Sequence, residues 1–157
     1  MRILVAGVGN LFLGDDGFGP AVARRLLGRA LPEGVEVVDS GIAGLHLAYR
    51  LLDAPDLLLV VDLVSRGGAP GTLYVLEPET DGVGLGDAHG MDLPSVFASL
   101  RALGGTPPRT RIVGCEPARV DEGMELSAAV ERAVDPAAEL VYELLERERT
   151  AQEEKAS

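Results

Sequence analysis

The fold of this chain is decided by one stretch near its N-terminus, Gly7-Val8-Gly9-Asn10-Leu11-Phe12-Leu13-Gly14-Asp15-Asp16-Gly17-Phe18-Gly19-Pro20. The apolar run Ile3-Leu4-Val5-Ala6 before it is typical of a buried strand. Pro20 suits the first turn of a helix, where its missing N–H would have had no partner. The stretch therefore predicts a strand, a glycine-rich loop and a helix, with two adjacent carboxylates in the loop.

A glycine-rich loop between a strand and a helix can bind a dinucleotide, but this loop fits that role poorly. Gly7 and Gly9 begin the G-x-G-x-x-G pattern, whereas Phe12 occupies the position of the third glycine. Asp15 and Asp16 would face the pyrophosphate, which binds at helix N–H groups away from negative charge. Two adjacent acids suit a metal ion or proton transfer better than a dinucleotide.

Composition limits the kind of protein. A chain of 157 residues with 46% hydrophobic and 25% charged residues is long enough for one globular domain. Its 25 acidic and 14 basic residues give a formal net charge of −11, which disfavours nucleic acid and anionic membranes as partners. One cysteine, Cys115, excludes an internal disulfide and a cysteine-rich zinc site. The sequence shows neither a signal peptide nor an apolar stretch near the ~20 residues of a membrane span, so we expect a cytoplasmic protein.

Apolar patterns along the chain predict strands that alternate mostly with helices. We predict strands at residues 3–6, 35–39, 57–62, 72–76 and 111–115, and helices at about 20–30, 45–52 and 92–103. The run at 57–61 is continuously apolar, which indicates a central parallel strand buried on both faces. A parallel return needs a crossover of about a dozen residues. Because 65–71 is shorter than that and made of turn residues, we expect the fourth strand to run antiparallel to the third.

These elements predict a three-layer α/β/α sandwich around a five-stranded, mostly parallel sheet with one antiparallel strand. A short helix after Ser127 is expected to end before a second helix restarts at Asp135-Pro136. We predict a single domain over residues 1–147 and a charged, disordered tail over residues 148–157.

Asp16, Asp62 and His89 are candidate site residues. Asp16 follows the first strand and Asp62 ends the third, so both should lie at the carboxyl ends of parallel strands, where such sheets bind ligands. The polar loop that holds His89 is long enough to reach the same edge. Two carboxylates and one imidazole suit a borderline divalent ion such as nickel, zinc or cobalt. Plainer explanations also fit: favourable placement beside a helix N-terminus, a hydrogen bond at a strand end and a solvated loop histidine.

The other reactive residue types are weaker candidates for a functional site. We expect Cys115 to behave as a small buried hydrophobe, because no local base could activate it as a nucleophile. We expect His46 on the exposed side of the second helix and assign it no role. Neither a G-x-S-x-G elbow nor an H-E-x-x-H helix occurs, which argues against a standard serine hydrolase or zincin.

An ordered set of motifs resembles the nickel–iron hydrogenase maturation endopeptidases. After the first stretch, the resemblance continues through Asp39-Ser40-Gly41-Ile42-Ala43-Gly44-Leu45, Val60-Val61-Asp62, Pro70-Gly71-Thr72, His89, Val113-Gly114-Cys115-Glu116-Pro117 and Gly123-Met124-Glu125-Leu126-Ser127. It spans nearly the whole chain in the right order. Cys115 and Glu116 depart from the family pattern, which more often has an aliphatic residue and Gln there.

The resemblance implies an aspartyl-type endopeptidase that removes a short C-terminal extension from a hydrogenase large subunit once nickel has been inserted. By motif, the nickel-recognising and catalytic residues would be Asp16, Asp62 and His89. The resemblance implies no permanent cofactor, because the nickel arrives with the large-subunit precursor, and we expect a monomer. Two alternatives stay open: an escort that senses nickel without cutting, and a metallohydrolase with its own metal.

Overall fold

The computed structural model describes residues 1–9, 14–41, 44–78, 93–118 and 125–156. A central sheet is built from β1 (Ile3–Val8), β2 (Val35–Gly41), β3 (Leu57–Leu63), β4 (Leu73–Leu76) and β5 (Arg109–Cys115). The strand order is β2-β1-β3-β5-β4, and β4 pairs antiparallel with β5 while the other pairs are parallel. The predicted fold class is confirmed, including the direction of the fourth strand.

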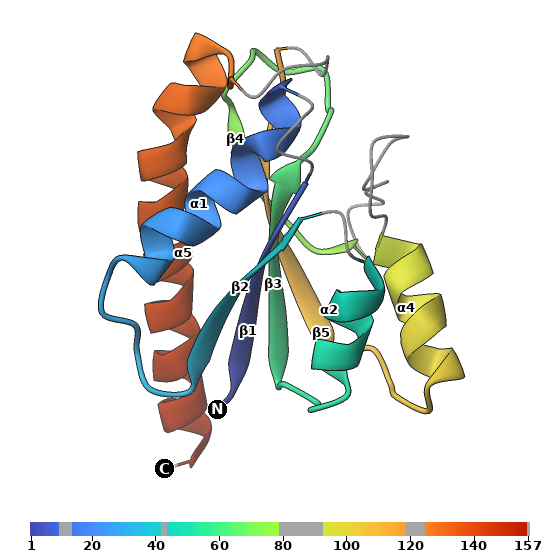
Figure 1. Cartoon of the computed structure of the whole chain (residues 1–157). Helices are drawn as coiled ribbons and strands as arrows, with labels where there is room; N and C mark the ends of the chain where they lie inside the picture. Colours follow the sequence, from blue (N-terminus) through green and yellow to red (C-terminus); the bar gives the residue numbers. More distant parts are fainter. Residues whose placement is uncertain (10–13, 42–43, 79–92, 119–124, 157) are drawn as a thin grey trace.

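Helices cover both faces of the sheet. One layer holds α1 (Phe18–Leu27) and α5 (Ala128–Ala156), and the other holds α2 (Gly44–Leu51) and α4 (Leu93–Ala102) (Figure 1). The N-terminus and the end of α5 lie at one end of the molecule, opposite the end toward which β1 and β3 run (Figure 1). None of the helices that the structure describes combines the length and apolarity needed to cross a bilayer.

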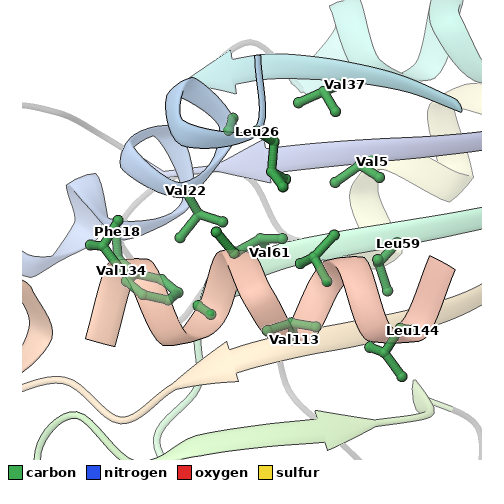
Figure 2. Close-up of a cluster of buried hydrophobic side chains, with 14 of the residues drawn as sticks. Val5, Phe18, Val22, Leu26, Val37, Leu59, Val61, Val113, Val134 and Leu144 are labelled. Atoms are coloured by element: carbon green, nitrogen blue, oxygen red, sulfur yellow. The ribbon is translucent and has the colours of Figure 1, made fainter. Parts of the chain in front are cut away.

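The hydrophobic core has one part on each side of the sheet. Because alternate side chains of a strand point to opposite faces, Leu57, Leu59 and Val61 join the part under α1 and α5. Leu58 and Val60 join the part under α2 and α4. The continuous apolar run of β3 therefore reflects burial on both faces. Figure 2 shows the first part, in which β1, β2, β3 and β5 meet α1 and α5 through Val5, Phe18, Val22, Leu26, Val37, Leu59, Val61, Val113, Val134 and Leu144.

Glycines of the first stretch let α1 lie directly on the sheet. A Cβ added at Gly19 would come within 3.0 Å of main-chain atoms of Val8 and Val61. A Cβ at Gly7 would come within 3.0 Å of the carbonyl group of Gly19 and of the Ala23 side chain. The main chain of α1 thus contacts β1 and β3 without intervening side chains. This contact fixes the start of α1 beside the ends of β1 and β3.

The C-terminal helix differs from the prediction. The predicted restart at Asp135-Pro136 and the predicted disordered tail from residue 148 are both wrong, because α5 is continuous from Ala128 to Ala156 with Pro136 inside it. A proline in a helix interior costs ~3 kcal/mol through a lost hydrogen bond and a steric clash. Burial of the apolar face of α5 against α1 and the sheet offsets that cost, since Val134, Ala137 and Val141 around the proline are all buried.

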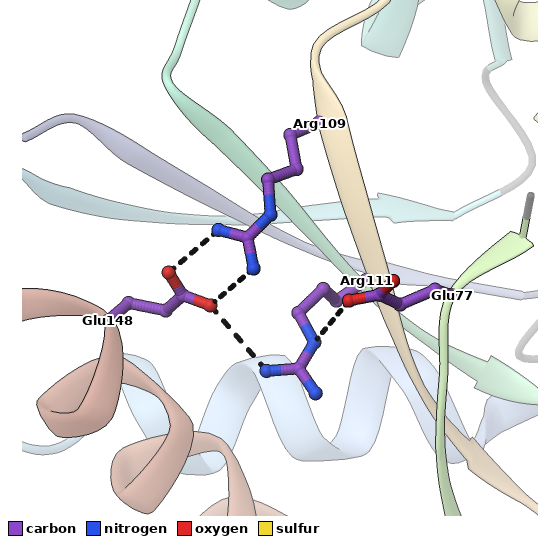
Figure 3. Close-up of polar contacts among 4 residues, drawn as sticks. All are labelled: Glu77, Arg109, Arg111 and Glu148. Atoms are coloured by element: carbon purple, nitrogen blue, oxygen red, sulfur yellow. Dashed lines mark hydrogen bonds and ion pairs between the residues drawn. The ribbon is translucent and has the colours of Figure 1, made fainter. Parts of the chain in front are cut away.

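A cluster of charged side chains attaches the last third of α5 to β5 (Figure 3). The Arg109 guanidinium donates to both carboxylate oxygens of Glu148, at 2.8 and 2.9 Å, and Arg111 donates to the same carboxylate at 3.5 Å. Arg111 also lies 3.7 Å from a carboxylate oxygen of Glu77 on the far side. The hydrogen bonds from Arg109 hold the pKa of Glu148 below its usual value. This nearly buried carboxylate explains why the helix is anchored where a tail was expected.

Glu148→Gln is expected to lower the free energy of unfolding by about 1–2 kcal/mol, because it weakens charge-assisted hydrogen bonds to two arginines. Urea unfolding at pH 7 would measure the change. Glu146→Gln is the matched control, since Glu146 is exposed and pairs with Arg149 of the same helix; it should shift stability by no more than about 0.5 kcal/mol. Equal effects in the two variants would show that the cluster does not anchor α5.

Candidate functional site

Asp16 lies on a 3-10 turn, η1 (Gly14–Gly17), just before α1, and only 7% of the residue is exposed. Its main chain packs directly on the end of β1. Gly9 has a φ of +145°, and a Cβ added there would overlap the Asp16 carbonyl oxygen. Only glycine therefore fits at this position. The contact between Gly9 and Asp16 therefore sets the main chain of Asp16 at the carboxyl end of β1.

Asp62 lies near the end of β3, beside Gly114 of β5, and is 5% exposed. One of its carboxylate oxygens accepts the N–H of Leu63 at 2.7 Å. Burial raises the pKa of Asp62 well above its usual value; the Leu63 hydrogen bond opposes the rise and the negative charge of Asp16 adds to it. The two predicted acids are therefore close enough to repel each other electrostatically. A cation or a shared proton between such groups would relieve that repulsion.

His89, the third predicted site residue, lies outside the described residues, so its place beside the two acids stays a prediction. Within the parts of the chain that the structure describes, no group of three or more His, Cys, Asp and Glu side chains could hold a metal ion. The part of the predicted site that the structure describes is thus the pair Asp16 and Asp62.

Asp15 is buried and hydrogen-bonded to residues that are distant in the sequence. Its carboxylate is entirely buried and accepts three hydrogen bonds from residues more than 100 positions away. One oxygen accepts the N–H of Ser127 at 2.6 Å; the other accepts the Ala118 N–H and the Ser127 hydroxyl, both at 2.9 Å. Asp15 therefore ties η1 to two points of the segment between β5 and α5. The sequence contained the acid, but no local pattern identified its partners.

Glu116, which directly follows β5, also binds a distant segment of the chain through its carboxylate. The residue is 5% exposed, and its carboxylate accepts the N–H groups of Arg66 and Gly68, at 2.9 and 2.7 Å, and the Tyr74 hydroxyl at 2.9 Å. Burial raises the pKa of Glu116, but the Arg66, Gly68 and Tyr74 hydrogen bonds outweigh it, so the pKa lies below its usual value. The carboxylate thereby fixes the turn that follows Asp62 and β3.

The lowered pKa of Glu116 predicts how stability depends on pH. Its stabilising effect is complete above the unfolded pKa of about 4.3 and is lost as pH falls through the lower folded pKa. Glu116→Gln should be less stable than wild type by about 1 kcal/mol at pH 7. That difference should shrink as the pH falls toward about 3.5, below the unfolded pKa. Urea unfolding at several pH values measures it, and a difference that does not change with pH would contradict the assignment.

Cys115 and His46 behave as predicted. Cys115 is completely buried, and burial, with smaller effects from the charges of Asp15 and Glu116, raises the pKa of its thiol to about 12. A thiol of this kind is not a nucleophile at neutral pH. His46 is exposed on α2.

Several known proteins similar to this chain are named as hydrogenase maturation proteases or endopeptidases. A family model described as hydrogenase maturation protease matches residues 20–144. Hydrogenase 2 maturation protease of Escherichia coli K12 is 34% identical over 152 residues, which is 92% of this chain and 91% of that protein. The solved structure of the maturating endopeptidase HybD from E. coli has a TM-score of 0.81 at 33% identity and 94% coverage of both chains. That of the NiFe hydrogenase maturation protease HycI from Thermococcus kodakarensis has a TM-score of 0.74 at 29% identity and 92% coverage of both.

Proposed function

Because this chain belongs to the hydrogenase maturation protease family, we propose that it removes the C-terminal extension of a nickel–iron hydrogenase large-subunit precursor once nickel has been inserted. The chain is a peptidase, because its family and its relative in E. coli are named as maturation proteases. The observation that carries the proposal is the pair Asp16 and Asp62, two nearly buried acids at the carboxyl ends of β1 and β3. Burial, with a smaller effect from the charge of Asp16, raises the pKa of Asp62.

Nickel would be recognised as part of the substrate. In this proposal Asp16, Asp62 and His89 complete the coordination of the nickel that the precursor carries, and the protein needs no metal of its own. Carboxylate oxygens and an imidazole nitrogen are suitable ligands for a borderline divalent ion. The positive charge would offset the repulsion between the two acids. Cleavage would then be conditional on correct loading of the precursor.

The acids also supply two routes to peptide hydrolysis once the precursor is bound. Either carboxylate can act as a general base toward a water molecule at the edge of the sheet. Alternatively, the substrate nickel can polarise the scissile carbonyl or the attacking water. In both routes the nickel contact holds the scissile peptide beside Asp16 and Asp62.

Incubation of the purified protein with nickel-loaded and nickel-free precursor, followed by intact-mass measurement, tests the proposal. We expect loss of a C-terminal peptide only from the nickel-loaded form, and no loss with Asp16→Asn. Asp135→Asn is the control, because Asp135 is exposed on α5 and pairs with Arg25 there; it should cleave like wild type. Nickel-dependent binding without cleavage would support an escort, and one tightly bound zinc per chain would support an ordinary metallohydrolase. Cleavage regardless of nickel would overturn the recognition step alone.

A further inference from the structure

Asp15 and Asp16 are adjacent on η1 but have different surroundings. The Asp15 carboxylate is entirely buried and accepts the hydrogen bonds from Ala118 and Ser127 described above. The main chain of Asp16 packs against Gly9, just after β1, and the charge of Asp16 acts on Asp62 near the end of β3. A short turn that carries both acids therefore has one side chain fixed within the protein and the next at the candidate site.

The position of Asp16 is restricted from two directions. On one side its carbonyl group lies against Gly9, with no space for even a methyl group between them. On the other side the preceding residue is held by three hydrogen bonds to its carboxylate. Since η1 spans only four residues, a rotation of Asp15 would move the main chain of Asp16 as well. The two restraints together limit where the main chain of Asp16, and with it the attached carboxylate, can lie.

We propose that Asp15 is a positioning residue that holds Asp16 where it can ligate a divalent cation together with Asp62; the inference rests on the proposed function. Groups that hydrogen-bond to metal ligands, or otherwise orient them, typically change metal affinity or activity by about 10–100-fold when they are removed. A role in stability alone would instead lower the folded fraction and leave cation binding by the folded protein unchanged. The two roles therefore predict different results.

Asp15→Asn separates them, because the variant keeps the shape of the side chain but places an NH₂ group among N–H and O–H donors. We expect its affinity for Ni²⁺ alone, measured by calorimetry at a temperature where the protein is folded, to fall by about 10-fold or more. Its rate of precursor cleavage should fall by a similar factor. Glu148→Gln is the matched control: it also alters a nearly buried carboxylate that accepts three hydrogen bonds, but at β5 and α5 away from the site. It should bind Ni²⁺ like wild type.

If Asp15→Asn does not fold, Ser127 provides a milder test. Ser127→Ala removes one donor to Asp15 and should weaken Ni²⁺ binding in the same direction, whereas Ser127→Thr keeps the hydroxyl and should not. Normal Ni²⁺ affinity in Asp15→Asn, with weakened affinity in Asp16→Asn, would overturn the positioning role and leave the proposed function intact. A wild-type protein that bound Ni²⁺ but cleaved no precursor would overturn the proposed function, while the comparison of Ni²⁺ affinities would still decide the role of Asp15. No Ni²⁺ binding by wild type would overturn the positioning role, which requires a cation site at Asp16 and Asp62, and would leave the proposed function to be decided by cleavage of the nickel-loaded precursor.

Discussion

Asp62→Asn is expected to slow cleavage of the nickel-loaded precursor by at least about 100-fold, more than loss of a supporting residue would, while leaving the protein at least as stable as wild type. The activity should fall because the variant lacks a carboxylate that can ligate nickel or accept a proton. The stability should not fall, because asparagine has nearly the same shape and keeps an oxygen for the Leu63 N–H. Intact-mass kinetics and urea unfolding at pH 7 measure the two effects.

The expected stability follows from the direction of the pKa shift. The folded pKa of Asp62 is raised, so the protonated form is favoured in the folded state and ionisation costs stability as pH rises through the folded pKa. Wild type should therefore lose stability relative to Asp62→Asn as pH increases from about 4, near the unfolded pKa. A residue that is retained at a cost in stability is typical of a functional site.

Asp135→Asn again serves as the control, since its carboxylate is exposed and pairs with Arg25 on α1. It should change neither the cleavage rate nor the pH dependence of stability. Cleavage by Asp62→Asn at the wild-type rate would show that the Asp62 carboxylate is not part of the site. A large loss of stability in Asp62→Asn would show that its charge is compensated by contacts that favour ionisation.

Local signals in the sequence were sufficient to predict much of the fold. The strand before the first loop and the helix after it are encoded side by side, and the apolar run of β3 marks a central strand. Asp16 and Asp62 could be placed together because the carboxyl ends of parallel strands meet at one edge of a sheet. That argument needs only the strand directions and no knowledge of side-chain contacts.

Predictions failed where distant residues decide the outcome. Asp135-Pro136 is a local signal for a helix start, yet packing against α1 and the sheet keeps α5 continuous through it. The partners of Asp15 lie more than 100 residues away, and those of Glu116 lie 42 to 50 residues away. No periodicity or motif spacing encodes such pairs. The sequence therefore showed which acids occur near the site but not which of them hold the surrounding loops.

The contact of α1 with the sheet yields the largest expected change in stability. Gly19→Ala should lower the free energy of unfolding by about 2–3 kcal/mol, because overpacking a close contact typically costs about 1–3 kcal/mol and here the added Cβ would meet main-chain atoms of both β1 and β3. Those atoms cannot rotate away as a side chain could. The higher helix propensity of alanine, worth up to about 1 kcal/mol, opposes the effect and is outweighed.

Gly28→Ala is the matched control for Gly19→Ala at the other end of the same helix. An added Cβ there would meet its nearest atom at 3.6 Å, an ordinary contact, and the φ of −82° suits alanine. Its stability in urea should stay within about 0.5 kcal/mol of wild type. Because α1 directly follows η1, Gly19→Ala should also slow precursor cleavage by more than its unfolded fraction explains. If Gly19→Ala were as stable as Gly28→Ala, α1 could withdraw from the sheet at little cost, and its contact with β1 and β3 would not be what holds η1 and Asp16 in place.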